Sequence, residues 1–378
     1  MHTPLRHSPL LCALAFATAC TEAAPLGPSS DARLAAAPPA DGRTTRAVTV
    51  MTRNLYIGAD ADLVIGALAT PDPDDDFPAL LSAIATLEQT SFPVRAAALA
   101  EEIARTRPDV VGLQEVEDLR IDLTPLGLPT NIDLHYLPLL QAALAARGLD
   151  YGVAGQLTSI VAEPFPGVSV VEREVILVNA RRVTVEPGVI ERNFAYNVGE
   201  VAPGVVLSSG WVQIQATIGG VPVTIASTHL QSGDGPDFTG LRAAQAIEFV
   251  ESVGAALPAI LLGDFNDVPG TPMDQVITGA GFADLWAALR PSAPGFTCCA
   301  LAELSNRAPT LTQRIDYLFA RGFKAGGREA ERLGSIMLVG DKSGDRVAGP
   351  AHRIWPSDHA GVVARLVIAP AEELAKDR

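Results

Sequence analysis

The chain has 378 residues, of which 48% are hydrophobic and 19% charged, with 33 Gly and 29 Pro. This composition excludes a disordered polyampholyte and a coiled coil. Lys and Arg number 28 against 43 Asp and Glu, so the formal charge is −15. Such an acidic chain lacks the clustered basic residues that bind nucleic-acid phosphates over a broad surface, although it is compatible with a local site.

The first twenty residues are typical of an export signal. Arg6 makes the start weakly basic, and the apolar stretch 10–20 is too short to span a bilayer but suits the hydrophobic region of a signal. Its end, ATAC at 17–20, resembles a lipoprotein cleavage box, so Cys20 is the expected lipidation site. The alternatives are cleavage by the ordinary signal peptidase and a buried N-terminal helix. We expect an exported protein, either an outer-membrane or cell-surface lipoprotein, or a secreted or periplasmic one.

The segment 21–46 is rich in Ala, Pro, Ser and Gly and predicts a disordered tether, since it cannot bury enough apolar area to fold. Residues 47–370 are expected to form one domain, and 371–378 a short tail. No apolar run after the signal reaches the roughly 18 residues of a membrane helix.

Strand-like and helix-like segments alternate along the domain. Helices are expected at 93–107, 136–147 and 241–253, where apolar residues recur at helical spacing. Strands are expected at 48–54, 109–114, 170–179, 211–218, 221–229, 259–263, 313–319 and 361–367. The pair Gly219-Gly220 indicates a hairpin turn. Because strands outnumber helices and come partly in hairpins, the sheets should be mixed.

Polar residues with catalytic potential follow the ends of these strands. Strand ends that open into loops are where such scaffolds present functional groups. A buried carboxylate is costly there unless it binds a metal or a partner. The candidates are Asn54, Glu115, His229, Asp264, Asn266, Asp316, Asp358 and His359.

The order of the surrounding motifs resembles the endonuclease/exonuclease/phosphatase family, the deoxyribonuclease I-like phosphodiesterases. The matching segments are TRN at 52–54, LQEVE at 113–117, STHLQ at 227–231, GDFND at 263–267, RIDYLF at 314–319 and SDH at 357–359. The resemblance implies an α/β domain of four layers, with two mixed β-sheets packed face to face, helices outside, and an active site at one edge between the sheets.

The resemblance also implies a divalent-metal site. Glu115 matches the main ligand, a hard oxygen donor suited to Mg²⁺ or Mn²⁺, with Asn54 beside it as a neutral oxygen ligand. Asp358 matches a further carboxylate on the metal side. A sparse cage is expected, because Mg²⁺ keeps several of its waters.

The remaining residues match the family's acid–base and phosphate-binding groups. Asp264 would orient or deprotonate the attacking water, and the amide of Asn266 would donate to a phosphate oxygen. His359 would donate a charge-assisted hydrogen bond to the phosphate, while Asp316 holds its imidazole and raises its pKa. His229 matches a second histidine, found in the nuclease and sphingomyelinase branches, that contacts phosphate and protonates the leaving group.

Two features leave alternatives open. Glu172-Arg173-Glu174 stands where many family members carry a Gly-rich stretch, and Arg173 is either a phosphate clamp or part of a surface ion pair. The neighbours Cys298 and Cys299 are compatible with a disulfide in an oxidising compartment, whereas a zinc site is disfavoured because no second pair of ligands accompanies them.

The sequence therefore predicts an exported, divalent-metal-dependent phosphodiester hydrolase. A nuclease is slightly favoured. A sphingomyelinase-like enzyme acting on phospholipid head groups and a phosphatase are the alternatives within the family. An alternative of another class is a catalytically silent surface protein that uses the fold for binding. The expected partners are a phosphodiester substrate and, through Cys20, a membrane; no protein partner is predicted.

Overall fold

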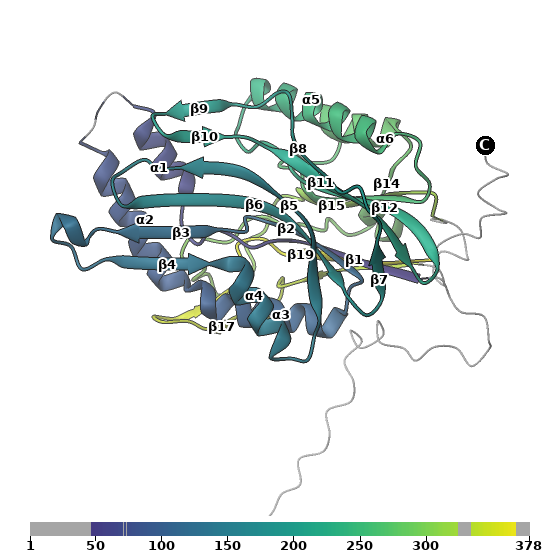
Figure 1. Ribbon diagram of the computed structural model, residues 1–378, viewed down its shortest axis with the longest axis horizontal. Helices are drawn as coiled ribbons and strands as arrows, with labels where there is room; N and C mark the ends of the chain where they lie inside the picture. Colours follow the sequence, from purple (N-terminus) through teal and green to yellow (C-terminus); the bar gives the residue numbers. More distant parts are fainter. Residues whose placement is uncertain (1–46, 71, 73, 324–333, 368–378) are drawn as a thin grey trace, which may run out of the picture. The chain divides into compact units, whose positions relative to one another are not determined.

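The computed structural model describes residues 47–70, 72, 74–323 and 334–367 (Figure 1). The expected signal with Cys20, the tether at 21–46 and the tail at 371–378 lie outside these residues. Among the helices that the structure does describe, none is long and apolar enough to cross a membrane.

The larger sheet is mixed and has ten strands within the described residues. Its central strands are β1 (Ala47–Asn54) and β2 (Val110–Gln114), which run parallel. The main path continues on either side in the order β16 (Gly334–Val339), β19 (Gly361–Val367), β1, β2, β6 (Val168–Asn179), β5 (Tyr151–Ala162), β10 (Val205–Leu207) and β9 (Gly199–Ala202). Off this path, β3 (Asp118–Asp122) pairs with β6 and with β4 (Asn131–His135).

The smaller sheet is also mixed, and its core is a parallel pair flanked by antiparallel neighbours. The order is β14 (Ala283–Asp284), β15 (Asp316–Arg321), β13 (Ala259–Asp264), β12 (Val221–His229), β11 (Gly210–Ile218) and β7 (Val183–Val185), with β8 (Ile190–Asn193) beside β11. The expected turn at Gly219-Gly220 joins β11 to β12, and both glycines have positive φ. A separate short hairpin joins β17 (Val347–Ala348) to β18 (Arg353–Ile354).

The two sheets pack face to face over an aliphatic core. Val50 and Ile176 of the larger sheet meet Ile214 and Ile260 of the smaller one in a single buried cluster. The sheets come close together at Gly112 in β2, where a Cβ would lie 1.9 Å from Leu262 and 2.5 Å from Ser227. The absence of a side chain at this position therefore permits this close packing.

Helices cover the outer faces of both sheets (Figure 1). On the larger sheet lie α2 (Asp76–Thr90), α3 (Phe92–Thr106) and α4 (Tyr136–Ala145), whose apolar faces share a core with β2, β3 and β6. On the smaller sheet lie α5 (Pro236–Val253) and α6 (Pro272–Gly279). Two further helices are short, α1 (Ala61–Leu68) and α7 (Leu285–Leu289). The four-layer α/β arrangement expected from the sequence is thus confirmed.

The expected elements are present, with small changes at their ends. The last expected strand of the smaller sheet begins at Asp316 instead of residue 313, because Gln313 forms only an isolated bridge to Cys298. The expectations from the sequence include none of α1, α2 and β5, and they also omit most of the short strands and the short helices α6 and α7.

Candidate active site

Both sheets contribute their strand ends to one cluster of polar side chains. In the smaller sheet, His229 is the register partner of Asp264, which is in turn the partner of Asp316. In the larger sheet, Asn54 pairs with Gln114, so that Glu115 follows directly at the same edge. Three neighbouring strands of one sheet therefore face the ends of two strands of the other.

Asp264 lies at the centre of this cluster. Its Oδ2 accepts a hydrogen bond from Nδ2 of Asn54 at 3.1 Å and lies 3.7 Å from Nδ1 of His359 and 3.8 Å from Nε2 of His229. The carboxylate is buried, which raises its pKa, as does the charge of Asp316, while the two imidazoles act in the opposite direction. The candidates from three distant sequence motifs therefore meet around one carboxylate.

Glu115 and Asn54 are held together on the other side. Nδ2 of Asn54 donates to Oε1 of Glu115 at 2.8 Å, and the backbone N–H of Ile57 donates to Oε2 at 2.7 Å. The amide oxygen of Asn54 accepts from the N–H of Tyr56 at 2.8 Å. Asn54 thus presents its nitrogen to both carboxylates, and a role as an oxygen ligand would require the amide to turn.

Glu115 and Asn266 share an unusual backbone conformation. Their φ angles are +53° and +50°, in the left-handed region that residues other than glycine adopt rarely. Each residue stands just beyond the end of its strand, where the chain turns out of the sheet. Such conformations cost of order 1–3 kcal/mol and concentrate at functional sites.

His359 and Asp316 form a buried pair, with Nδ1 of the imidazole 2.8 Å from Oδ2 of the carboxylate. Burial opposes protonation of His359, but the charges of Asp316 and Asp358 outweigh it and raise its pKa to about 10. The imidazole is therefore cationic at neutral pH. Because Nδ1 faces Asp316, Nε2 is the nitrogen that can donate to a ligand, and its neighbour here is the sulfur of Cys299 at 4.0 Å.

His229 lies beside two carboxylates for which the sequence alone predicts no role. Its Nδ1 lies 3.5 Å from Glu172 and 3.3 Å from Glu174, which alternate along β6 and point to the same side. Burial opposes protonation of His229, yet these two carboxylates raise its pKa well above the usual value. The two glutamates are two residues apart, so they lie on the same face of their strand. This spacing is the signal from which a shared contact with a histidine could have been predicted.

Asn266 and Arg173 hold positions that bear on their expected roles. Nδ2 of Asn266 donates to the carbonyl of Leu230 at 2.8 Å, which leaves its second amide hydrogen for a ligand. Arg173 points away from Glu172 and Glu174 and forms an ion pair with Asp118 at 2.5 Å. It is not among the residues around the cluster, so the geometry corresponds to the ion-pair interpretation and not to a phosphate clamp.

Two buried arginines, also missed from the sequence, fix the backbone of the site. Arg53 pairs with Glu102 at 3.0 Å and donates to the carbonyl of His359. Arg95 donates to the carbonyls of Leu55 and Tyr56. Each guanidinium thus joins segments that carry catalytic candidates. Arg53 is the middle residue of the TRN motif. A basic residue within a predicted buried strand indicates a buried ion pair, and this was the signal that the sequence offered.

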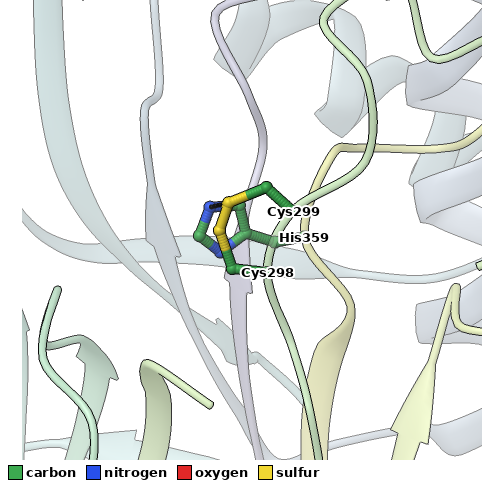
Figure 2. A group of neighbouring side chains, drawn as sticks. All are labelled: Cys298, Cys299 and His359. Atoms are coloured by element: carbon green, nitrogen blue, oxygen red, sulfur yellow. Dashed lines mark hydrogen bonds between the residues drawn. A yellow bond between two sulfur atoms is a disulfide. The ribbon is translucent and has the colours of Figure 1, made fainter. Parts of the chain in front are cut away.

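A disulfide between Cys298 and Cys299 lies beside His359 (Figure 2). Sγ of Cys299 is 4.0 Å from Nε2 of the imidazole. The segment is tied to the same loop by the backbone, because the N–H of Ala300 donates to the carbonyl of Asp358 at 2.8 Å. The cysteine pair therefore lies next to Nε2 of His359.

The cluster opens into a cavity of about 620 Å³. Glu115, His229, Asp264, Asp358 and His359 all line it, so the polar groups described above share one solvent-accessible space. Its volume falls within the roughly 300–1,000 Å³ of typical small-molecule sites. The arrangement places two imidazoles of raised pKa, those of His229 and His359, on either side of the Asp264 carboxylate, where they can bind an anion.

Comparison with known proteins identifies the chain's relatives. The sequence profile of the Endonuclease/Exonuclease/phosphatase family matches residues 88–359. The chain belongs to this family. Members of this family are phosphoester hydrolases, which makes the present protein one of them. The matched range holds all of the candidate site residues except Asn54.

Solved structures share the family fold. An endonuclease/exonuclease/phosphatase from Beutenbergia cavernae DSM 12333 covers 86% of this chain and 72% of its own, with a TM-score of 0.54 and 23% identity. A family protein from Bacteroides thetaiotaomicron covers 85% and 95%, with a TM-score of 0.51 and 17% identity. A mannosyl-6-phosphatase of Bacteroides thetaiotaomicron VPI-5482 covers 85% and 100%, with a TM-score of 0.50 and 17% identity. At these identities the likeness shows the fold alone. Among curated proteins, none matches the chain.

The family generally uses a divalent metal, and the donor set of this chain fits one. Burial, followed by the charges of Asp358 and Glu172, raises the pKa of Glu115 to about 7. Burial and the charges of Glu172 and Glu115 also raise the pKa of Glu117 well above normal. A divalent cation would offset this concentration of negative charge. The donors are oxygens, which Mg²⁺ and Mn²⁺ prefer.

Proposed function

We propose that the protein is a divalent-metal-dependent phosphodiester hydrolase that is exported from the cell. The observation that carries this proposal is the meeting of Glu115, Asp264 and His359 around one cavity. These residues come from separate motifs, and each has the chemistry that one part of the hydrolysis requires. The same geometry argues against a catalytically silent binding protein, because none of the three groups is lost.

Asp264 would act on the attacking water, and His359 on the phosphate. The carboxylate of Asp264 orients the attacking water and accepts its proton. His359, kept cationic by Asp316, donates from Nε2 to a phosphate oxygen as negative charge develops there. His229, protonated between Glu172 and Glu174, has its Nε2 on the Asp264 side and donates a proton to the leaving oxygen.

Glu115 and Asp358 are the residues that would hold the metal. The bound ion, Mg²⁺ or Mn²⁺, supplies Lewis-acid polarisation of the phosphoryl oxygen. Asn54 fixes the position of the Glu115 carboxylate from the side of Asp264. Asn266 keeps one amide hydrogen for a phosphate oxygen, so the anion is bound from both sheets.

Hydrolysis of bis(p-nitrophenyl) phosphate by the purified protein tests this proposal. We expect turnover with Mg²⁺ or Mn²⁺, none with EDTA, and slower release from the monoester p-nitrophenyl phosphate. Asp264→Asn and His359→Ala should each lower turnover by at least ~10²-fold. Asp150→Asn, at an exposed carboxylate, is the matched control for the first variant. Activity that survives complete chelation would refute the metal role.

Export and lipidation rest on the sequence of residues 1–20 and have their own test. A lipid on Cys20 would place the folded domain at a membrane surface on the tether 21–46. Cys20→Ser should move the protein from the membrane fraction to the soluble fraction of the producing cells. Wild-type protein that is already free in the medium would contradict lipidation while leaving export in place.

A further inference from the structure

The cavity at the active site extends well beyond the polar cluster. Away from the catalytic residues it runs beneath α1 and α2 and along β5 and β10. Aliphatic side chains line this part, among them Val64, Leu68, Leu80, Ala83, Ile160 and Val205. We refer to this part of the cavity as the apolar chamber. It is continuous with the site where the phosphate would be bound.

The charge of the lining excludes a polyanion from the apolar chamber. Within the described part of the chain, no Lys or Arg lines the cavity, and the charged residues near α1 are the acids Asp60 and Asp62. A nucleic-acid strand carries a phosphate at every nucleotide and is bound through cations and stacked aromatic rings. Tyr56 and Phe238 are the aromatic residues in the lining, and the hydroxyl of Tyr56 already donates to Ala302.

The helical part of the wall of the apolar chamber lies almost entirely before the matched family range. The helices α1 and α2 occupy 61–68 and 76–90, whereas the family profile begins at residue 88. The side chains of Val64, Ile65 and Leu68 are only half-buried, and all three face the cavity. Helix α1 therefore leaves apolar surface open toward the cavity, which a ligand with apolar surface would cover.

We propose that the apolar chamber binds the hydrocarbon chain of a lipid phosphoester whose phosphate occupies the catalytic cluster. This inference rests on the proposed phosphodiesterase function and names its substrate class. The hydrocarbon chain of the lipid would lie between α1 and α2 on one side and β5 and β10 on the other. The phosphate would lie beside His229 and His359, with its phosphorus presented to the water that Asp264 orients.

A series of p-nitrophenyl alkyl phosphates tests the proposal. The alkyl group is lengthened from methyl to butyl, octyl and dodecyl, and kcat/KM is measured with Mg²⁺ below the micelle concentration of each ester. Burial of each methylene should raise kcat/KM by up to about fourfold, until the chamber is filled. Equal values across the series, with the methyl ester hydrolysed, would overturn the lipid assignment and leave the phosphodiesterase intact.

Two positions on one helix provide matched variants. Ala83 lines the apolar chamber, and Ala85, also in α2, is exposed and outside it. Ala83→Trp should lower the dodecyl-to-methyl ratio of kcat/KM by at least ~10-fold, whereas Ala85→Trp should leave the ratio unchanged. Val64→Trp fills the chamber from α1 and serves if the first variant does not fold. An unchanged ratio in a folded chamber variant would contradict the proposal.

Binding without turnover separates the two hypotheses. Isothermal titration with dodecyl phosphate and methyl phosphate measures the apolar chamber independently of catalysis. We expect the dodecyl compound to bind at least ~10²-fold more tightly, and Ala83→Trp to remove most of this difference. If the protein shows this binding preference but hydrolyses none of the esters, the result would support lipid binding by the apolar chamber and refute the proposed phosphodiesterase function. Equal binding of both compounds, together with tight binding of a single-stranded oligonucleotide, would instead favour nucleic acid.

Discussion

Nδ1 of His359 lies 2.8 Å from Oδ2 of Asp316, and both side chains are buried. The pair joins the smaller sheet to the SDH loop, so the position of the imidazole depends on a residue of another strand. Because Nδ1 is engaged by the carboxylate, Nε2 is the atom that remains for a ligand. We therefore propose that Asp316 positions the imidazole, and its charge also raises the pKa of His359.

Replacing this carboxylate should reduce turnover more than binding. In Asp316→Asn the imidazole loses the largest of the charges that raise its pKa, so we expect kcat to fall by about 10²-fold or more with a smaller change in KM. Steady-state kinetics on bis(p-nitrophenyl) phosphate would measure both constants. Asp150→Asn provides the exposed control. Wild-type kinetics in the buried variant would show that Asp316 does not position the imidazole.

Glu115→Gln should weaken metal binding. The substitution removes one negative charge from a buried cluster of oxygen donors but keeps the shape of the side chain. We expect the affinity for Mn²⁺, measured by isothermal titration, to fall by at least ~10-fold. Glu88→Gln, at an exposed position of α2, is the control. Equal affinities in the two variants would place the metal elsewhere.

Arg173→Gln should have little effect on catalysis. The guanidinium contacts Asp118 at 2.5 Å, and about a quarter of the side chain is exposed. We expect kcat/KM to stay within about twofold of wild type, and the free energy of unfolding to fall by about 1 kcal/mol or less. A loss of substrate affinity would restore the phosphate-clamp interpretation of this residue.

Cys298 and Cys299 should resist alkylation in the native protein. Because the two sulfurs are joined, iodoacetamide should modify neither residue until a dithiol reductant has been added under denaturing conditions. Mass spectrometry of the peptide that carries both residues would then show two added groups. Modification of either residue without reduction would contradict the disulfide.

Gly112→Ala should destabilise the fold. The new Cβ would meet Leu262 and Ser227 of the opposite sheet, and such overpacking costs about 1–3 kcal/mol. Chemical denaturation would measure the free energy of unfolding. Gly152→Ala is a suitable control, because this glycine lies in β5 of the same sheet and a Cβ there meets no atom within 4 Å. Equal stability of both variants would show that the sheets can move apart at no cost.

The residues at strand ends could be predicted from the sequence because each follows a short apolar run that is easy to recognise. Asp264 after AILLG and Glu115 after VVGLQ are examples, and the structure brings both to one cavity. The roles of these residues remain predictions. The fold was predictable for the same reason, since the runs define the central strands of both sheets.

Other parts of the site depend on contacts between distant segments. Glu172 and Glu174 look like surface charges in the sequence, and only the approach of β12 to β6 buries them against His229. The role of Arg95 could not be predicted either, because its partners are backbone carbonyls that no sequence motif encodes. The apolar chamber could not be foreseen either, since an apolar side chain that lines a cavity has the same pattern as one in a core.

The division of the site between two sheets links enzymatic activity to the folding of the whole domain. Glu115 belongs to one sheet and Asp264 to the other, and a single amide from Asn54 connects them. A partly folded chain with only one layer formed would therefore be inert. During gradual denaturation, turnover should disappear no later than the near-ultraviolet signal of native packing, so the reaction itself reports whether the halves remain joined.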